Sequence, residues 1–262
     1  MDFKNKVAVV TGGANGIGRC IVETFLSVGA RVAFIDIDEE SGVSIAANYE
    51  PDRVLFVAGD IAEQETLEFF TEKIAEFFGR VDYLVNNACI FSKGGILTGC
   101  DYEDFNHVLA IGVTAPYMLS KLLLPIFNDK AAIVNISSTR AHMSQPNTEP
   151  YSAAKGGLYA LTHALSASLA GKVRVNCINP GWIDTGGFHG DADYIPTFEH
   201  QDSEQHPVGR IGRPADIATL TLFLCSTHAS FITGQDISVD GGMSKLMIYN
   251  NSQGWKYMPE TE

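Results

Sequence analysis

Thr11-Gly12-Gly13-Ala14-Asn15-Gly16-Ile17-Gly18 is the stretch near the start of the chain that decides the fold. It follows Lys6 to Thr11 (KVAVVT), a short apolar, β-branched run typical of a buried parallel strand. After it, apolar residues recur at helical spacing: Ile17, Ile21, Val22, Phe25 and Leu26. A strand, a glycine turn and a helix N-terminus leave backbone N–H groups and the positive end of a helix dipole where a pyrophosphate can bind. The stretch therefore predicts a nucleotide-binding α/β fold, and a tight turn without a ligand is the less favoured interpretation.

The next apolar run, Arg31 to Asp36 (RVAFID), ends in a carboxylate eighteen residues after Gly18. An acid at this position can accept hydrogen bonds from the two ribose hydroxyls of an adenosine and would repel a 2′-phosphate. Asp38, Glu39 and Glu40 follow without any Arg or Lys. The pattern favours NAD over NADP. The alternative is that Asp36 only caps the following helix.

Tyr151 and Lys155 are four residues apart, so on a helix they share one face. A fixed positive charge favours the phenolate and lowers the pKa of a tyrosine toward the range useful for acid/base catalysis. Tyr151 is therefore a candidate acid/base. Alone, this spacing is weak evidence, because such pairs arise often by chance.

Alternating strands and helices run along the whole chain. They predict one α/β domain over residues 1–262, a single-domain Rossmann fold with a doubly wound parallel seven-stranded sheet and helices on both faces. The longest helices are expected at 102–127 and 151–170. Strands are expected near 6–11, 31–36, 54–58, 81–86, 131–137, 173–178 and 236–239.

Composition narrows the classes of partner and location. The net charge of −13, from 31 acidic and 18 basic residues, disfavours nucleic acid and acidic protein carriers. No apolar stretch approaches the roughly 20 residues that a membrane span needs, and the N-terminal apolar run is too short for a signal peptide. Five cysteines, an odd number without a CxxC pair, indicate reduced thiols and a cytoplasmic protein.

Six motifs in order resemble the classical short-chain dehydrogenase/reductase family, from about Lys4 to Met243. Thr11 to Gly18 resembles the family's TGxxxGxG turn, and Gly59-Asp60-Ile61 resembles its adenine-contacting segment. Asn86-Asn87-Ala88-Cys89 stands where the family has NNAG, and Ile136-Ser137-Ser138 stands at its catalytic-serine strand. Tyr151 to Lys155 matches the family's YxxxK. Pro180 to Thr185 resembles the PGxxxT segment that holds the nicotinamide amide.

The resemblance implies that Ser138 hydrogen-bonds the substrate oxygen, that Tyr151 exchanges its proton, and that Lys155 also binds the nicotinamide ribose. Hydride would pass directly between NAD and substrate, with no metal, and no His/Cys/Asp cluster shows metal-ligand spacing. A homotetramer or dimer is implied by analogy, through the small residues after Ser152. The cofactor-binding residues implied are Gly12, Asn15, Gly16, Ile17, Gly18, Asp36, Ile37, Asp60, Ile61, Asn87, Ala88, Tyr151, Lys155, Pro180, Gly181, Ile183 and Thr185.

Two positions depart from the family pattern. Gly112 stands where the family has a catalytic asparagine that supports a water in its proton relay, and a glycine cannot supply that side chain. Cys89 replaces the glycine of NNAG. A reactive thiolate would need a positive neighbour, and none is near it in sequence, so a small buried hydrophobe is the expected role of Cys89.

Substrate choice is expected to come from irregular segments. A long one near 185–213 suggests a lid. Thr139 to Glu149 carries several polar side chains, which suit a hydroxylated or charged small molecule; Arg140 and Trp182 are the candidate substrate contacts. The polar side chains are Arg140, His142, Gln145, Asn147 and Glu149. The tail 243–262, with Tyr249, Trp255 and Tyr257, is expected either to dock on a subunit or to be disordered near its end.

These features predict an NAD-dependent oxidoreductase that transfers hydride to or from a secondary alcohol or carbonyl of a polyol, sugar or related hydroxy compound. Two alternatives stay open. One is a non-catalytic NAD-binding regulatory protein, favoured only by Gly112. The other is a 3-oxoacyl-carrier-protein-type reductase, which the acidic net charge disfavours.

Overall fold

The computed structural model describes residues 3–91, 94–190, 193–247 and 249. Its strands form one parallel sheet of seven in the order β3-β2-β1-β4-β5-β6-β7. This confirms the predicted fold class. The strands are β1 (Val7–Thr11), β2 (Arg31–Asp36), β3 (Val54–Ala58), β4 (Val81–Asn86), β5 (Phe127–Ile136), β6 (Val173–Pro180) and β7 (Asp236–Val239).

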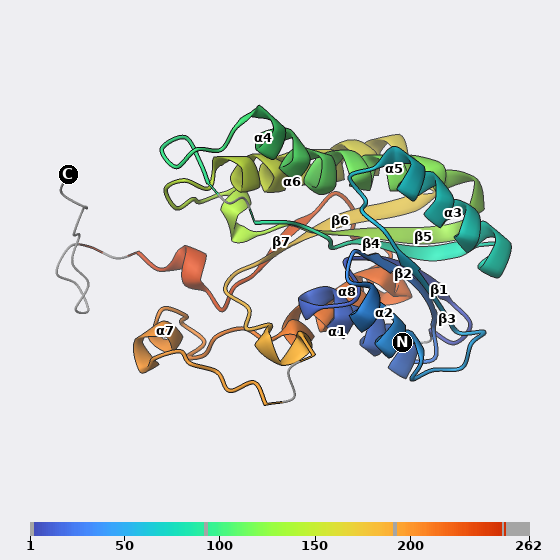
Figure 1. Ribbon diagram of the computed structural model, residues 1–262, viewed down its shortest axis with the longest axis horizontal. Helices are drawn as coiled ribbons and strands as arrows, with labels where there is room; N and C mark the ends of the chain where they lie inside the picture. The colour runs from blue at the N-terminus through green and yellow to red at the C-terminus, as the bar shows by residue number, and fades with distance from the viewer. Residues whose placement is uncertain (1–2, 92–93, 191–192, 248, 250–262) are drawn as a thin grey trace.

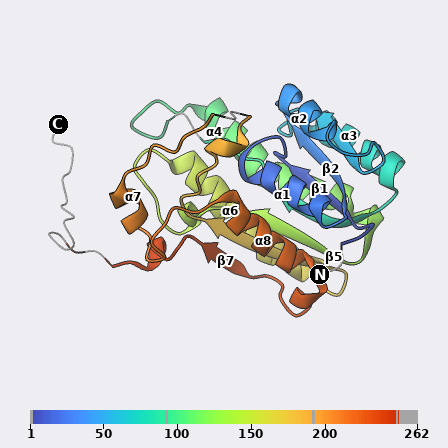
Figure 2. The same ribbon diagram turned by 90° about the horizontal axis from the view of Figure 1, so that it is seen from below.

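Helices cover both faces of the sheet, as Figures 1 and 2 show. One face carries α1 (Gly16–Ser27), α2 (Glu39–Ala46) and α8 (Pro214–Cys225). The other carries α3 (Gln64–Phe78), α4 (Tyr102–Leu109), α5 (Ala115–Leu122) and α6 (Glu149–Ser168). The short helix α7 (His200–Glu204) lies outside these layers.

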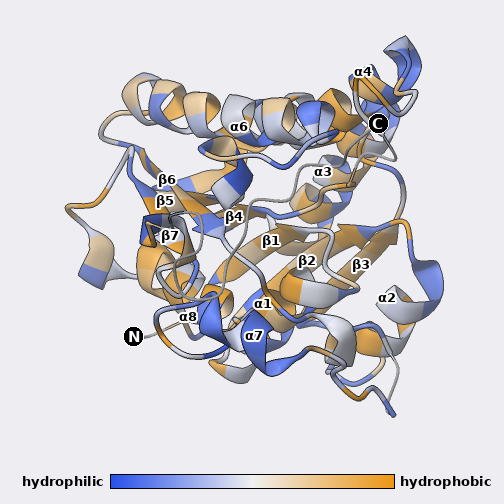
Figure 3. Ribbon diagram, turned by 90° about the vertical axis from the view of Figure 1, so that its left-hand side faces the viewer, coloured by the Kyte–Doolittle hydropathy of each residue, from blue (hydrophilic) through white to orange (hydrophobic). Residues whose placement is uncertain are grey.

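Each strand sends alternate side chains to opposite faces, which produces two apolar cores. In β1, Ala8 and Val10 pack on the α1 side, while Val7 and Val9 pack on the side of α3 and α5. Figure 3 shows the apolar strands enclosed between the helices. Full burial of one such aliphatic or aromatic side chain stabilises a fold by about 1.5–3 kcal/mol. Packing in the two cores therefore fixes the positions of the strands and of the loops at their carboxyl ends.

The sheet has its switch point between β1 and β4. From β1 the chain moves outward to β2 and β3, then returns to the opposite side of β1 as β4. In open α/β sheets the strand ends at such a point form a crevice in which ligands bind. The glycine turn after β1 lies in this crevice.

The predicted continuous helix over 102–127 is wrong. The structure has α4, a π-helical turn η1 (Ala110–Thr114), α5, a 3₁₀ turn η2 (Leu124–Ile126), and then β5 from Phe127 onward. Pro116 has no N–H, so it cannot donate to the carbonyl of Gly112 as an α-helix requires. The π-helical turn spans the place where that hydrogen bond would have formed.

The segment near 185–213 contains the 3₁₀ turn η4 (Gly186–Phe188) and α7, with Asp191 and Ala192 outside the described residues. A bridge between Ile183 and Gly212 ties its two ends together. Of the tail, η6 (Met243–Lys245) is described, whereas Trp255 and Tyr257 lie outside the described residues. Within the described part of the chain, none of the helices has the length and apolar character to cross a membrane.

Candidate active site

The glycine turn between β1 and α1 is packed too closely for side chains. A Cβ on Gly18 would lie 1.9 Å from the carbonyl oxygen of Gly12, and Gly16 has a φ of +56°. Asn87, just after β4, donates its amide Nδ2 to the carbonyls of Thr11 and Gly12, both at 3.0 Å. The turn is therefore clamped to the end of β4.

The start of α1 offers an anion site. Its N-cap residue, Asn15, makes no side-chain capping hydrogen bond and instead donates to Asp38 at 2.8 Å. The first N–H groups of the helix thus have no side-chain acceptor, and the dipole favours a negative group there. Together with the close backbone approach at Gly12 and Gly18, this fits the pyrophosphate of a dinucleotide.

A cavity of about 380 Å³ extends from this turn along the ends of β1 to β4. Many of the predicted cofactor residues line it: Gly12, Asn15, Gly16, Ile17, Asp36, Ile37, Asp60, Ile61, Asn87, Ala88 and Thr185. Residues that sequence reasoning missed also line it: Gly59, Ile35, Cys89, Ile90, His107, Ile111 and His189. Gly59 and Cys89 belong to quoted motifs but were not among the implied cofactor residues, and only the tertiary fold brings His107 from α4 and His189 from the lid segment to the cavity.

Six predicted cofactor residues do not line this cavity: Gly18, Tyr151, Lys155, Pro180, Gly181 and Ile183. Gly18 is part of the packing of the turn itself. Pro180 ends β6, and a Cβ on Gly181 would lie 2.6 Å from the Cβ of Asp240. Ile183 lines a separate cavity of about 330 Å³ under α8. These residues hold the segment that leads into Thr185.

Asp36 faces the glycine turn. Its Oδ2 accepts from the N–H of Ala14 at 2.9 Å, and its Oδ1 accepts from the N–H of Asp38 at 3.1 Å. The idea that Asp36 caps the next helix is wrong, because Asp38 is the N-cap of α2 and accepts from Ser41 N–H at 3.0 Å. That backbone hydrogen bond, with the one from Asn15, lowers the pKa of Asp38. Asp36 therefore lines this end of the cavity, with Asp38 bonded to the lining residue Asn15, and the described lining contains no Lys or Arg.

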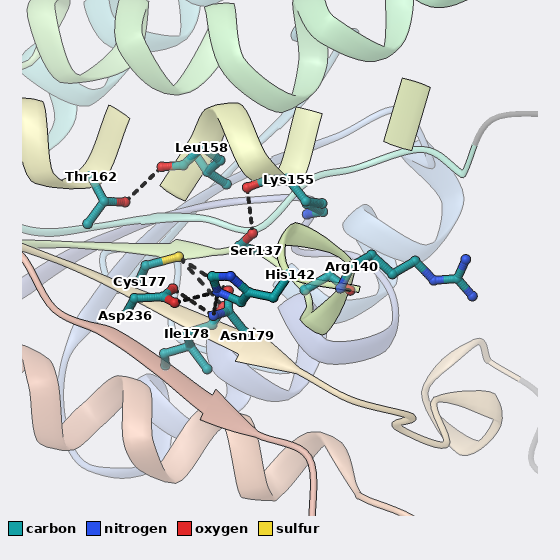
Figure 4. Close-up of polar contacts among 11 residues, drawn as sticks. Ser137, Arg140, His142, Lys155, Leu158, Thr162, Cys177, Ile178, Asn179 and Asp236 are labelled. Carbon is teal, nitrogen blue, oxygen red and sulfur yellow. Dashed lines mark hydrogen bonds and ion pairs between the residues drawn. The ribbon is translucent and has the colours of Figure 1, made fainter. Parts of the chain in front are cut away.

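Ser138, Tyr151 and Lys155 meet where β5 and α6 come together. The Ser138 side chain lies next to Tyr151 and favours its phenolate form, and Lys155 Nζ lies 5.5 Å from the Tyr151 ring centroid. Lys155, only 2% exposed, donates from Nζ to the carbonyl of Ile136 at 2.8 Å. Ser137 donates its hydroxyl to the carbonyl of Lys155 at 2.8 Å, which fixes α6 to β5 (Figure 4).

Burial raises the pKa of Tyr151, and the opposing effects of Lys155, Ser138 and Arg140 only reduce that rise. The expectation of a net lowered pKa is therefore wrong, because the sequence does not show how much water the fold removes from the phenol. Burial alone would lower the pKa of Lys155, but the neighbouring Cys89 and Tyr151 outweigh it and raise that pKa. Lys155 is thus an ammonium at neutral pH beside a protonated phenol.

Cys89 does not have the expected role of a small buried hydrophobe. Its side chain is exposed, lines the cavity and lies beside Lys155. The positive neighbour that was absent from the local sequence is Lys155, which comes from α6.

Gly112 is buried against α6 in the π-helical turn η1. A Cβ on Gly112 would lie 2.7 Å from the Cβ of Ala154, so the asparagine usual at this position has no room here. The two helices approach more closely than such a side chain would allow.

Most of the polar side chains expected to contact substrate are engaged within the protein. Asn147 and Glu149 accept from the N–H groups of Leu97 and Ile96, at 3.2 and 3.3 Å. His142 pairs with Asp236 at 2.6 Å. Gln145 accepts from Arg140. The interpretation of this loop as a broad polar wall is therefore too general. Within the described part of this loop, Arg140 is the side chain with a buried donor that has no acceptor.

Trp182, the other candidate substrate residue, lies beside the lid segment. Its ring contacts those of Phe198 and His206, with centroids 6.4 and 6.3 Å apart. The side chain is 40% exposed. The described part of the chain contains no cluster of three or more His, Cys, Asp or Glu side chains that could bind a metal ion.

Comparison with protein families gives a match over residues 12–244 to a family described as "Enoyl-(Acyl carrier protein) reductase". An "Uncharacterized oxidoreductase" of Thermotoga maritima is 43% identical over 94% of this chain and 99% of its own length. A 3-oxoacyl-[acyl-carrier-protein] reductase of Chlamydia muridarum is 36% identical, covering 92% and 98%. An L-fucose dehydrogenase of Mus musculus is 35% identical, covering 92% and 89%.

Solved structures agree with these relatives. An apo SCOR enzyme from Clostridium thermocellum has a TM-score of 0.86 at 44% identity, covering 98% of this chain and 99% of that one. A Brucella melitensis protein described as a short-chain dehydrogenase/reductase, glucose/ribitol dehydrogenase, has a TM-score of 0.85 at 33% identity, covering 92% and 98%. A blue fluorescent protein from a metagenomic library, in complex with NADPH, has a TM-score of 0.83 at 28% identity, covering 93% and 100%.

Proposed function

The chain belongs to the short-chain dehydrogenase/reductase family of oxidoreductases, and from this premise we propose that it is an NAD-dependent enzyme acting on a secondary alcohol or carbonyl of a small polar molecule. A polyol, sugar or related hydroxy compound is the substrate class. The observation that carries the proposal is the contact of Ser138, Tyr151 and Lys155 next to a cavity with Asp36 at its other end.

NAD is the proposed cofactor because of charge. Asp36 and Asp38 would repel the 2′-phosphate of NADP, and the described lining of the cavity supplies no Lys or Arg to hold it. The metagenomic blue fluorescent protein binds NADPH, so the same fold can also accept the phosphorylated cofactor. For this chain, the proposal of NAD over NADP rests on the charges of Asp36 and Asp38.

The bound nicotinamide would accept or deliver the hydride at the reacting carbon. Tyr151 exchanges the hydroxyl proton with the substrate oxygen, while Ser138 donates a hydrogen bond to that oxygen. The Lys155 ammonium favours the phenolate form of Tyr151 and adjoins the cofactor cavity through Cys89. The segment near 185–213 serves as a lid over the substrate, with Trp182 at its base.

Two other functions have weaker support. A reductase of substrates tethered to acyl carrier protein is suggested by the matched family's description and the Chlamydia relative, but a net charge of −13 would repel an acidic carrier. A non-catalytic NAD-binding protein is suggested by Gly112, but Ser138, Tyr151 and Lys155 are all present and in contact. We further propose a cytoplasmic homo-oligomer, a tetramer or dimer, by analogy with the family.

The test is NAD reduction, followed by absorbance, across polyols, sugars and secondary alcohols, with NADP in parallel. Turnover with NAD should fall at least about 100-fold in Tyr151→Phe, which removes the proton-exchanging hydroxyl. The variant should still bind NAD, because the phenol is not part of the glycine turn. Equal turnover in Tyr151→Phe, or tight NAD binding without turnover of any substrate, would remove the support for this proposal.

A further inference from the structure

We propose that the substrate is a hydroxy acid whose carboxylate is bound by the guanidinium of Arg140. This inference rests on the proposed function and narrows its substrate class from neutral polyols to anionic hydroxy compounds. It starts from Arg140, whose Nη1 is buried without a hydrogen-bond acceptor among the described residues.

Arg140 has a charge without a partner. Among the described residues it makes no ion pair, and its Nη1 is shielded from solvent without a hydrogen-bond acceptor. Its Nη2 donates only to the neutral side chain of Gln145. A buried N–H without an acceptor is unfavourable, and more so on a charged group. In a chain of net charge −13, acids are plentiful, so an unpaired cation is the unusual choice.

The position of Arg140 is beside the reacting groups. The guanidinium carbon lies 5.3 Å from the ring centroid of Phe91, and the Phe91 and Tyr151 ring centroids are 5.2 Å apart. Arg140 is close enough to Tyr151 to favour the phenolate. Its backbone N–H donates to the Ser138 hydroxyl oxygen at 3.1 Å. A group bound by Arg140 therefore belongs to the same small molecule that Ser138 and Tyr151 would bind.

The loop holds Arg140 in place without neutralising it. His142, two residues on, pairs with Asp236, whose other oxygen accepts from Asn179 Nδ2 at 2.6 Å. Figure 4 shows this network and the Arg140 side chain extending away from it. Glu149 is bonded to the N–H of Ile96. The acids on this side of the site are thus bonded to other groups.

The Arg140 guanidinium lacks a hydrogen-bond acceptor and a negative partner, and a carboxylate supplies both, whereas a hydroxyl does not. A planar guanidinium can donate two parallel N–H groups to the two oxygens of one carboxylate, and the charges cancel. A hydroxyl would meet one donor and leave the charge unpaired.

The test compares substrates that differ only in the charged group: 3-hydroxybutanoate with 3-hydroxybutanamide, and gluconate with glucitol. Arg140→Gln removes the charge, Arg140→Lys keeps it without the paired donors, and Lys121→Gln removes an exposed charge from α5 as a matched control. The wild type should prefer the acid of a pair, and Arg140→Gln should raise the KM of that acid about 10- to 100-fold. The KM values of the amide and of glucitol should not move.

Binding gives a second readout that does not depend on turnover. With saturating NAD, calorimetry of butanoate against butanamide should show tighter binding of butanoate, lost in Arg140→Gln and partly kept in Arg140→Lys. The inference is overturned if butanoate binds the wild type no better than butanamide, or if Arg140→Gln affects acids and amides equally. It is also overturned if the phosphate ester of 1,3-butanediol is preferred to 3-hydroxybutanoate. Oxidation of glucitol that depends on Tyr151 would leave the proposed function standing in any of these cases.

Discussion

At the scale of single residues, the site combines a protonated phenol with three groups that favour its ionisation. Burial outweighs Lys155, Ser138 and Arg140, so the pKa of Tyr151 lies above its ordinary value. The sequence predicts that Lys155 prepares Tyr151 to act as a base. In the fold, Tyr151 is instead protonated at neutral pH and can act as an acid. This arrangement suits proton donation to a carbonyl at neutral pH, and it makes alcohol oxidation depend on pH.

The first prediction concerns that dependence. A group with a raised pKa stays protonated through the neutral range and loses its proton only at high pH. Oxidation needs the phenolate, so kcat/KM for alcohol oxidation should rise steadily from pH 7 to 9, whereas carbonyl reduction should stay level over that range. Steady-state rates in both directions measure this. A maximum of oxidation near pH 7 would contradict it.

The second prediction concerns Asp36 and the preference for NAD over NADP. Asp36→Asn keeps the shape of the side chain but replaces the carboxylate, whose two oxygens would accept hydrogen bonds from the ribose hydroxyls. The KM for NAD should rise about 10-fold or more, and discrimination against NADP should weaken. Glu39→Gln, at an exposed acid at the start of α2, is the matched control and should change neither value. An unchanged NAD to NADP ratio in Asp36→Asn would show that charge at this position is not the selector.

Cys89 gives the third prediction. Its exposed thiol lines the cavity beside Lys155, so iodoacetamide should label it first and saturating NAD should protect it. Cys100 is the internal control, because desolvation and the acids Asp104 and Asp101 raise the pKa of its thiol. Peptide mass spectrometry with and without NAD measures both sites. Labelling of Cys100 before Cys89, or no protection by NAD, would contradict this placement.

At the scale of elements, the helix between β4 and β5 shows how one proline shapes the site. Pro116 withholds the N–H that the Gly112 carbonyl would need, and the chain forms a π-helical turn there. Gly112 then lets this turn lie against Ala154 of α6, the helix that carries Tyr151 and Lys155.

The fourth prediction tests that packing. Gly112→Asn should destabilise the protein by about 1–3 kcal/mol, because its Cβ would overlap Ala154. Gly112→Ala should show much of the same loss, since the overlap begins at Cβ. Adding Ala154→Gly should recover stability in both. Urea unfolding and the Kd of NAD measure the effect; a double variant no more stable than Gly112→Asn would place the strain elsewhere.

At the scale of the whole molecule, charge separates two candidate functions. A net charge of −13 repels an acidic carrier protein over long range. The fifth prediction is that 3-oxoacyl groups on acyl carrier protein react no faster, in kcat/KM, than the same acyl groups on pantetheine. A preference for the carrier of 10-fold or more would favour the carrier-dependent function.

Local patterns predicted most of the fold because they depend on neighbours in sequence. The strands 31–36, 54–58, 81–86 and 236–239 have the expected bounds. The glycine turn was visible for the same reason. The unbroken helix over 102–127 was a wrong prediction, although Pro116 was there to mark the break.

By itself, the sequence determined the order of strands and helices, the nucleotide turn and the family, since periodicity, glycine placement and motif order are local properties. Only the tertiary structure decided which side chains remain available to bind substrate or cofactor and which protonation state they have. Burial set the direction of the pKa shift of Tyr151, and the fold placed Lys155 of α6 beside Cys89, which follows β4. Contacts with residues outside the loop engage His142, Asn147 and Glu149, whereas Nη1 of Arg140 is buried without an acceptor. Those outcomes depend on distances and on lost solvent, which arise when segments far apart in the chain meet.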